Sequence, residues 1–138
     1  MSIQRFRYTP HPQLPVGLPL LPIQLFSDTE NILVYALVDS GSALNILPFD
    51  VGLELGLVWE EQNFPLDMGG FLENVQAYGV VLHVKLTNFS WTKLAFAWVE
   101  RPSPEVRVLL GQMNFFQEFD VHFYGHQNIF EISSPKAS

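Results

Sequence analysis

The chain has 138 residues, a formal net charge of −7 and no cysteine. This length predicts one domain with a single core. The acidic balance argues against nucleic acid or an anionic membrane as a partner, and no segment approaches the roughly 18 apolar residues of a membrane span. The absence of cysteine excludes disulfides and thiolate zinc sites, and with no evident signal peptide it favours a reducing, cytoplasmic setting.

Residues 1–22 contain five of the ten prolines of the chain. Because proline lacks a backbone N–H and interrupts helices, this segment predicts an extended arm that can add an edge strand. We therefore divide the chain into an N-terminal arm at 1–22, one domain at 23–132 and a tail at 133–138.

The domain is expected to begin with a β-hairpin. Residues 23–26 predict a short strand, residues 27–31 contain turn formers, and residues 32–38 are apolar on both faces. A run that is apolar throughout and too short for a typical helix is typical of a buried strand. This strand ends at Asp39 and so delivers a carboxylate into the core.

Asp39 is followed by Ser40, Gly41 and Ser42. A buried ionised carboxylate needs a proton, a counter-ion or hydrogen-bond donors, and the two hydroxyls are donors within reach once Gly41 turns the backbone. The plain alternative is a β-turn, because Asp, Ser and Gly are the commonest turn residues. The apolar segments on both sides of the motif favour a functional site over a simple turn.

Further along the chain, residues 49–55 predict a short helix that stops at Gly56. Residues 64–86 predict a hairpin with its tip at residues 68–70. A Gly-Gly pair at such a tip is also the default two-residue loop of a hairpin, so the tip alone does not indicate a function.

Alternation of apolar and polar residues predicts antiparallel strands at 80–86 and 93–98. Residues 101–105 break the second strand, and residues 106–111 form an apolar run that ends in Gly. A closing hairpin is expected from residues 119–132. The whole pattern predicts a strongly twisted all-β core filled by aromatic side chains.

These features together resemble the retropepsins, the single-domain family of aspartic proteases. Residues 37–42 match the family signature position by position: two apolar residues, Asp, Thr or Ser, Gly, then Ala or Ser. Residues 106–111 resemble the second family mark, two apolar residues and Gly, and Gly-Gly-Phe at 69–71 resembles the flap that covers the substrate. The resemblance covers roughly residues 20–132 and implies an all-β, retropepsin-like closed β-barrel with one or two short helices.

The resemblance implies an aspartic endopeptidase that acts as a homodimer on peptide or protein substrates, needs no metal or cofactor, and binds pepstatin-type inhibitors. Two Asp39 carboxylates, one from each chain, share one proton and activate the attacking water. Ser40 bonds to the partner's loop, and Gly41 and Ser42 support the catalytic loop. We expect Oγ of Ser42 to donate to the outer oxygen of Asp39.

The same resemblance implies the substrate contacts. Leu37 and Leu109 correspond to walls of the substrate pockets, and Arg107 is expected near their rim. The flap comprises Met68, Gly69, Gly70 and Phe71. Apolar pockets of this kind predict a preference for apolar or aromatic residues on both sides of the cleaved bond.

Two positions depart from the retroviral members of the family. Those members pair an Asp soon after the catalytic Gly with an Arg just after the second Gly, whereas this chain has Ala43 and Gln112 there. The ion pair that braces the retroviral dimer is therefore absent. The closing hairpin resembles the cellular and bacterial pattern more than the short interleaved termini of retroviral enzymes.

Two other functions stay open. A retropepsin fold without useful proteolysis would serve as a dimerisation and interaction module. A small, monomeric acidic β-barrel that binds an apolar ligand would use Asp39 only as a turn residue. A metal site is not predicted, because His122 and His126 lie on an expected strand and turn and no neighbouring Glu completes a zincin motif.

Overall fold

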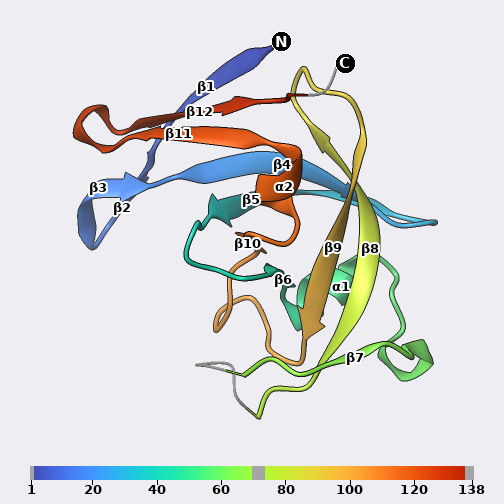
Figure 1. Cartoon of the computed structure of the whole chain (residues 1–138). Helices are drawn as coiled ribbons and strands as arrows, with labels where there is room; N and C mark the ends of the chain where they lie inside the picture. Colours follow the sequence, from blue (N-terminus) through green and yellow to red (C-terminus); the bar gives the residue numbers. More distant parts are fainter. Residues whose placement is uncertain (1, 70–73, 136–138) are drawn as a thin grey trace.

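The computed structural model describes residues 2–69 and 74–135 and has a closed β-barrel at its centre (Figure 1). Six strands form the barrel, and each pairs with the next. In spatial order they are β4 (Leu20–Phe26), β5 (Asn31–Val38), β10 (Leu109–Leu110), β6 (Asn45–Leu47), β9 (Thr92–Val99) and β8 (Ala77–Leu86). β8 pairs back onto β4, which closes the barrel. The all-β, closed-barrel fold expected from the sequence is confirmed.

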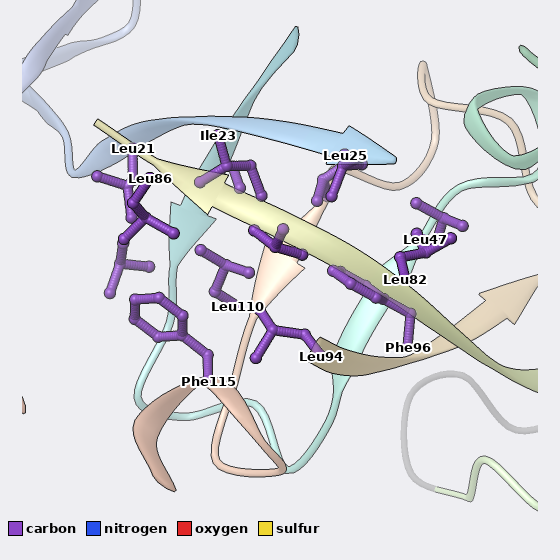
Figure 2. Close-up of a cluster of buried hydrophobic side chains, with 14 of the residues drawn as sticks. Leu21, Ile23, Leu25, Leu47, Leu82, Leu86, Leu94, Phe96, Leu110 and Phe115 are labelled. Carbon is purple, nitrogen blue, oxygen red and sulfur yellow. The ribbon is translucent and has the colours of Figure 1, made fainter. Parts of the chain in front are cut away.

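The barrel interior is a packed apolar core. The alternation predicted for residues 80–86 is confirmed, because every second side chain of this part of β8 is buried. The buried residues are Val80, Leu82, Val84 and Leu86. Figure 2 shows side chains from β4, β8, β9 and β10 gathered in one cluster with Phe115 of the short helix α2 (Phe115–Glu118). Residues far apart in the sequence therefore share one core.

The β5 strand differs from the expectation that both of its faces are buried. Ala36 and Val38 point into the core, but Leu33 and Tyr35 on the other face are 55% and 58% exposed. A run that is apolar throughout is buried on both faces only where a second layer covers the strand. Here residues 103–108 border the outward face and leave a surface hollow instead of covering it.

The N-terminal arm and the closing hairpin form a second, three-stranded sheet. β1 (Ile3–Arg7) pairs antiparallel with β12 (Ile129–Ser133), which pairs with β11 (Asp120–Tyr124). The turn between β11 and β12 is the 3-10 helix η3 (Gly125–Gln127). The predicted edge strand and closing hairpin are therefore confirmed.

An ionic contact ties the three strands of this sheet together. Arg5 donates two hydrogen bonds to Oε2 of Glu131, at 3.0 and 2.7 Å, and the hydroxyl of Tyr124 donates to Oε1 at 3.1 Å. The Arg5 bonds hold the pKa of Glu131 below its usual range, and Glu131 raises the pKa of Tyr124. One residue from each strand contributes to this contact.

The remaining elements are short. β2 (Thr9–His11) and β3 (Leu14–Leu18) form a separate hairpin that extends to the left in Figure 1. The 3-10 helix η1 (Trp59–Glu61) leads to β7 (Pro65–Leu66), which pairs with the start of β8. No helix in the described ranges is long and apolar enough to cross a membrane.

Helix α1 (Phe49–Glu54) packs closely against β9. Nε1 of Trp98 donates to the carbonyl of Phe49 at 3.1 Å, and a Cβ added to Gly52 would lie 2.2 Å from the Trp98 indole. The predicted helix at 49–55 is confirmed to within one residue, and Gly56 ends it with a positive φ of 78°.

Candidate active site

Asp39 lies just after β5, at the start of a tight loop that leads to β6. Its backbone N–H donates to the carbonyl of Leu110 at 2.9 Å, which anchors the loop to β10. The N–H of Gly41 donates to Oδ1 of Asp39 at 2.9 Å, and the N–H of Ser42 donates to the Asp39 carbonyl at 3.1 Å. The carboxylate is therefore oriented by a backbone donor.

Asp39 is half-buried in the protomer, and Ser40 and Gly41 are exposed. The expectation that the strand delivers this carboxylate into the core is therefore wrong. Since β5 ends at Val38, the chain leaves the barrel before Asp39 and turns at the surface. An ionised carboxylate at this place keeps contact with water and needs no buried counter-ion.

We expected the Ser42 hydroxyl to donate to the Asp39 carboxylate, but it bonds a different group. Its Oγ donates to the carbonyl of Leu44 at 2.6 Å, and a hydroxyl has only one proton to donate. Serine side chains commonly bond a nearby backbone group in tight loops, and here the carbonyl two residues ahead is the available acceptor. Ser42 supports the loop backbone and leaves orientation of the carboxylate to Gly41.

The segment after β10 forms the back of the loop. The backbone N–H groups of Gln112 and Met113 donate to the carbonyls of Ser42 and Ala43, both at 2.9 Å. A Cβ added to Gly111 would lie 2.4 Å from the carbonyl oxygen of Leu44 and 2.6 Å from that of Ser42. Only glycine therefore allows the two backbone segments to approach this closely.

Gln112 makes one further contact with the loop. Its Nε2 donates to the carbonyl of Ser40 at 2.8 Å. The position at which retroviral members carry the Arg of an ion pair thus contributes a neutral hydrogen bond in this chain. The bond reaches the residue next to Asp39, so it restrains the loop at its exposed tip.

Asn45 is a structural residue of the site that was not expected from the sequence. It is fully buried, and its Oδ1 accepts from the N–H of Gly111 at 2.7 Å. Its Nδ2 donates to the carbonyl of Ala95 at 2.9 Å and to Oδ1 of Asn114 at 3.2 Å. A polar residue between the apolar neighbours Leu44 and Ile46 was the available signal, because a buried amide requires partners.

The two expected pocket residues lie side by side. Leu109 of β10 pairs with Leu37 of β5 in parallel register, and both are half-buried. Leu109 also packs against a second, smaller apolar cluster formed by Ile46, Ala77, Ala97 and Val99. Leu44 and Met68 contact the same cluster, so the Asp39 loop and the base of the expected flap adjoin one apolar surface.

The expected flap hairpin is present as far as the structure describes it. β7 and β8 pair antiparallel, with Leu66 opposite Ala77, and Gly69 has a positive φ of 52°. Of the four flap residues, Met68 and Gly69 are described, whereas Gly70 and Phe71 lie outside the described residues. The strand pairing expected within 64–86 is confirmed at Pro65–Leu66 and Ala77–Tyr78. The expected tip at 68–70 lies partly outside the described residues, and its role as a substrate flap remains a prediction.

Two surface hollows lie away from the Asp39 carboxylate. One lies between β5 and residues 103–108, and the other lies between the terminal sheet and Gln112. In the described part of the chain, no group of three or more His, Cys, Asp or Glu side chains could hold a metal ion. Asp39 is thus a partly exposed carboxylate on a loop that backbone hydrogen bonds hold in place.

Two aspartic proteases of known structure share this fold. A retropepsin-like aspartic protease from Rickettsia conorii superposes with a TM-score of 0.67 and 13% sequence identity, over 95% of this chain and 91% of that chain. EIAV protease, in complex with the inhibitor HBY-793, superposes with a TM-score of 0.54 and 17% identity, over 79% of this chain and 91% of that chain. No protein-family model and no curated protein matched the sequence.

Proposed function

We propose that this chain, whose fold is that of the retropepsin-like aspartic proteases, is an aspartic endopeptidase that acts as a homodimer. The observation that carries the proposal is the Asp39 loop. A carboxylate at the end of a barrel strand is oriented by the N–H of Gly41 and backed by β10. The sequence around it is Asp-Ser-Gly, and this motif occurs once in the chain.

One carboxylate per chain requires two chains for a catalytic dyad. In a two-fold dimer the two Asp39 loops face each other across the axis, and each Ser40 bonds to the partner's loop. Two carboxylates about 3 Å apart cannot both ionise, so the pair holds one proton.

The reaction follows from this shared proton. The ionised carboxylate removes a proton from a water molecule, which attacks the scissile carbonyl while the protonated carboxyl donates to the carbonyl oxygen. The tetrahedral intermediate collapses after the amine is protonated. Within the described residues Oδ1 of Asp39 accepts from Gly41 and Oδ2 accepts no hydrogen bond, so Oδ2 is the oxygen open to water.

The apolar surface next to the loop supports a substrate preference. Leu37 and Leu109 would form walls of the pockets beside the cleaved bond, and the hairpin that carries Met68 would cover the bound peptide. Burial of an apolar side chain in such pockets stabilises the complex, so we expect peptides with apolar or aromatic residues at the cleaved bond. No metal or cofactor takes part in this mechanism.

The decisive experiment compares Asp39→Asn with the matched control Asp28→Asn, which makes the same change in the exposed turn between β4 and β5. A peptide library is incubated with each protein from pH 3 to pH 7, with and without a statine-type transition-state analogue. We expect Asp39→Asn to lose at least about a thousandfold of the rate, with dimer and fold intact, because Asn cannot exchange the proton. The control should keep full activity.

Turnover that survives in a carefully purified Asp39→Asn protein would remove the assignment. A folded wild-type dimer that cleaves no peptide over the whole pH range would instead support an interaction module with this fold.

A further inference from the structure

The hairpin formed by β2 and β3 projects from the barrel beside the Asp39 loop. The pairing of β4 with β5 extends back to Pro19, whose carbonyl accepts from the N–H of Val38, the last residue of β5, at 3.1 Å. Residues 9–18 therefore lie beyond the point at which β5 ends. Figure 1 shows β3 continuing the line of β4 to the left, past the end of β5.

The hairpin has a defined structure of its own. Thr9 pairs with Leu18, and His11 pairs with Leu14. A Cβ added to Gly17 would lie 2.4 Å from the carbonyl oxygen of Thr9, and Gly17 has a positive φ of 77°, so the close approach of the two strands requires glycine. Among the described strands, β2 and β3 pair only with each other.

The far part of this hairpin exposes apolar side chains. Residues 12–16 are all exposed, and Leu14 and Val16, which are two residues apart on β3, are 42% and 56% exposed. A two-stranded hairpin without a packing partner is only marginally stable in water, and adjacent exposed apolar side chains mark contact surfaces. The hairpin therefore carries an apolar surface that its own chain leaves uncovered.

The proposed dyad indicates which molecule covers this surface. The register of β4 and β5 places Leu18 level with Asp39. Leu14 precedes Leu18 by four residues, and a strand advances about 3.3 Å per residue, so the hairpin extends about 13 Å beyond the catalytic position. A dyad places the partner's carboxylate within about 3 Å of Asp39. Because β3 continues in the direction in which β5 leads to Asp39, the hairpin reaches the space that the partner chain occupies.

The hollow between the terminal sheet and Gln112 is suited to receive the partner's hairpin. Gln112 donates to the carbonyl of Ser40 at 2.8 Å, so the hollow adjoins the Asp39 loop. Ile3, which is 59% exposed, and Phe116 contribute apolar surface to its lining. None of the described hairpin residues lines this hollow in its own chain. In a two-fold dimer each hairpin also starts beside the Asp39 loop, so it lies next to the hollow of the other chain.

We propose that the β2–β3 hairpin is a dimer clasp, in which Leu14 and Val16 of each chain are buried against the hollow beside the partner's Gln112. The proposal rests on the proposed function, because it assumes that the two Asp39 loops face each other. The clasp differs from an exchange of terminal strands, since β1 pairs with β12 of its own chain. It supplies apolar contacts to a dimer that has Ala43 and Gln112 in place of the retroviral ion pair.

The first test compares the dimer dissociation constants of Val16→Asp and the matched control Val81→Asp by sedimentation equilibrium. Val81 is 66% exposed on β8, outside the hairpin and the hollow, so both variants replace an exposed valine and add one negative charge. We expect Val16→Asp to weaken the dimer about a hundredfold, because burial of one valine contributes about a factor of ten and a dimer contains two clasps. Val81→Asp should dimerise nearly as tightly as the wild type.

The second test locates the contact by cross-linking. The chain has no cysteine, so introduced thiols have no competitors. A tagged chain with Leu14→Cys is mixed with an untagged chain with Ile3→Cys and treated with a short bismaleimide. We expect a covalent product of one tagged and one untagged chain, whereas the control pair of Val81→Cys with Ile3→Cys should give none. Equal dimer affinity of Val16→Asp and Val81→Asp, or equal yields from the two cysteine pairs, would overturn the clasp.

Peptide cleavage by the same proteins keeps the two proposals distinct. If the wild-type dimer cleaves peptides and Val16→Asp dimerises as tightly as the Val81→Asp control, the clasp is rejected and the proposed function stands. If the dimer depends on Val16 but cleaves no peptide from pH 3 to pH 7, the clasp stands and the peptidase assignment is rejected. If both hold, the activity of Val16→Asp should recover at high protein concentration, because the hairpin does not contact the reacting atoms.

Discussion

At the scale of single residues, the Asp39 loop is held mainly by backbone groups in close contact. The N–H of Gly41 bonds the carboxylate, and a Cβ on Gly41 would lie 3.3 Å from its Oδ1. Behind the loop, Gly111 brings its backbone against the carbonyls of Ser42 and Leu44. The two glycines therefore serve close approach, and neither has the positive φ that also selects glycine.

Gly111→Ala is expected to lower the free energy of unfolding by about 2–3 kcal/mol, as overpacking of a tight site commonly does. The added methyl group would lie 2.4 Å from a backbone oxygen, so the loop or β10 must move. Chemical denaturation measures the loss. The matched control is Gly125→Ala, because nothing lies within 4 Å of a Cβ at Gly125 and the change should cost much less. Equal effects of the two substitutions would contradict the packing account.

Ser42→Ala is expected to cost about 1 kcal/mol of stability, the usual net contribution of one hydrogen bond, because the carbonyl of Leu44 loses its donor. The acidic limb of the kcat/KM profile should stay in place, since the hydroxyl does not contact the carboxylate. Unfolding in urea and a pH–rate profile measure the two effects. A shift of the acidic limb would mean that the hydroxyl turns toward Asp39 in the active dimer.

At the scale of secondary-structure elements, the two-residue strand β10 organises the site. It pairs in parallel with β5 and antiparallel with β6, so it joins the strand before the Asp39 loop to the strand after it. The buried amide of Asn45 then links the start of β6 to β9 and to Gly111. The geometry of the loop therefore depends on segments about 70 residues apart in the sequence, which the barrel brings together.

A second link joins α1 to the segment before β10 and makes stability depend on pH. Burial raises the pKa of Asp50, but the hydrogen bonds from the Ser103 side chain and backbone outweigh it, and the net pKa is lowered from 3.8. A lowered pKa in the folded state adds stability that is present above pH 3.8 and is lost as the pH falls through the folded value.

Asp50→Asn should therefore lose stability relative to the wild type above about pH 4, and this difference should shrink as the pH falls below 3.8. Denaturation with urea at pH 2.5, 4 and 6 measures the difference at each pH. Asp28→Asn controls for the loss of one negative charge. A difference that grew on acidification would contradict the assigned role of the Ser103 bonds.

At the scale of the whole molecule, the single Asp39 per chain predicts a two-fold dimer, which sedimentation over micromolar concentrations can detect. Each chain has a formal charge of −7, so two chains repel at long range. Gln112 makes a neutral hydrogen bond to Ser40 of its own chain and so contributes no ionic attraction between the chains. We therefore expect dimerisation to become tighter as salt screens the repulsion. A monomer that cleaves peptides would contradict the two-chain dyad, and dissociation by salt would contradict the charge argument.

Much of the barrel could be predicted from the sequence because its signals are local. Alternation along residues 80–86 predicted which side chains of β8 are buried, and the stop at Gly56 predicted the end of α1. The resemblance of residues 37–42 to the retropepsin signature led to the fold, and the two solved structures compared above are aspartic proteases with the same fold. Patterns of this kind depend on neighbours within a few residues, which a sequence displays directly.

The tertiary structure alone decided which groups meet. The sequence predicted that the Ser42 hydroxyl bonds Asp39, but the path of the loop brings it to the carbonyl of Leu44. The exposure of Tyr35 and the position of Arg107 beside it depend on how β10 and residues 103–108 pass the outward face of β5. The partners of Asn45 come from β9 and from Gly111. Hydrogen-bond partners and coverage by a second layer are long-range properties, because closure of the barrel places segments that are distant in sequence in contact. A local sequence pattern does not indicate which segments these are.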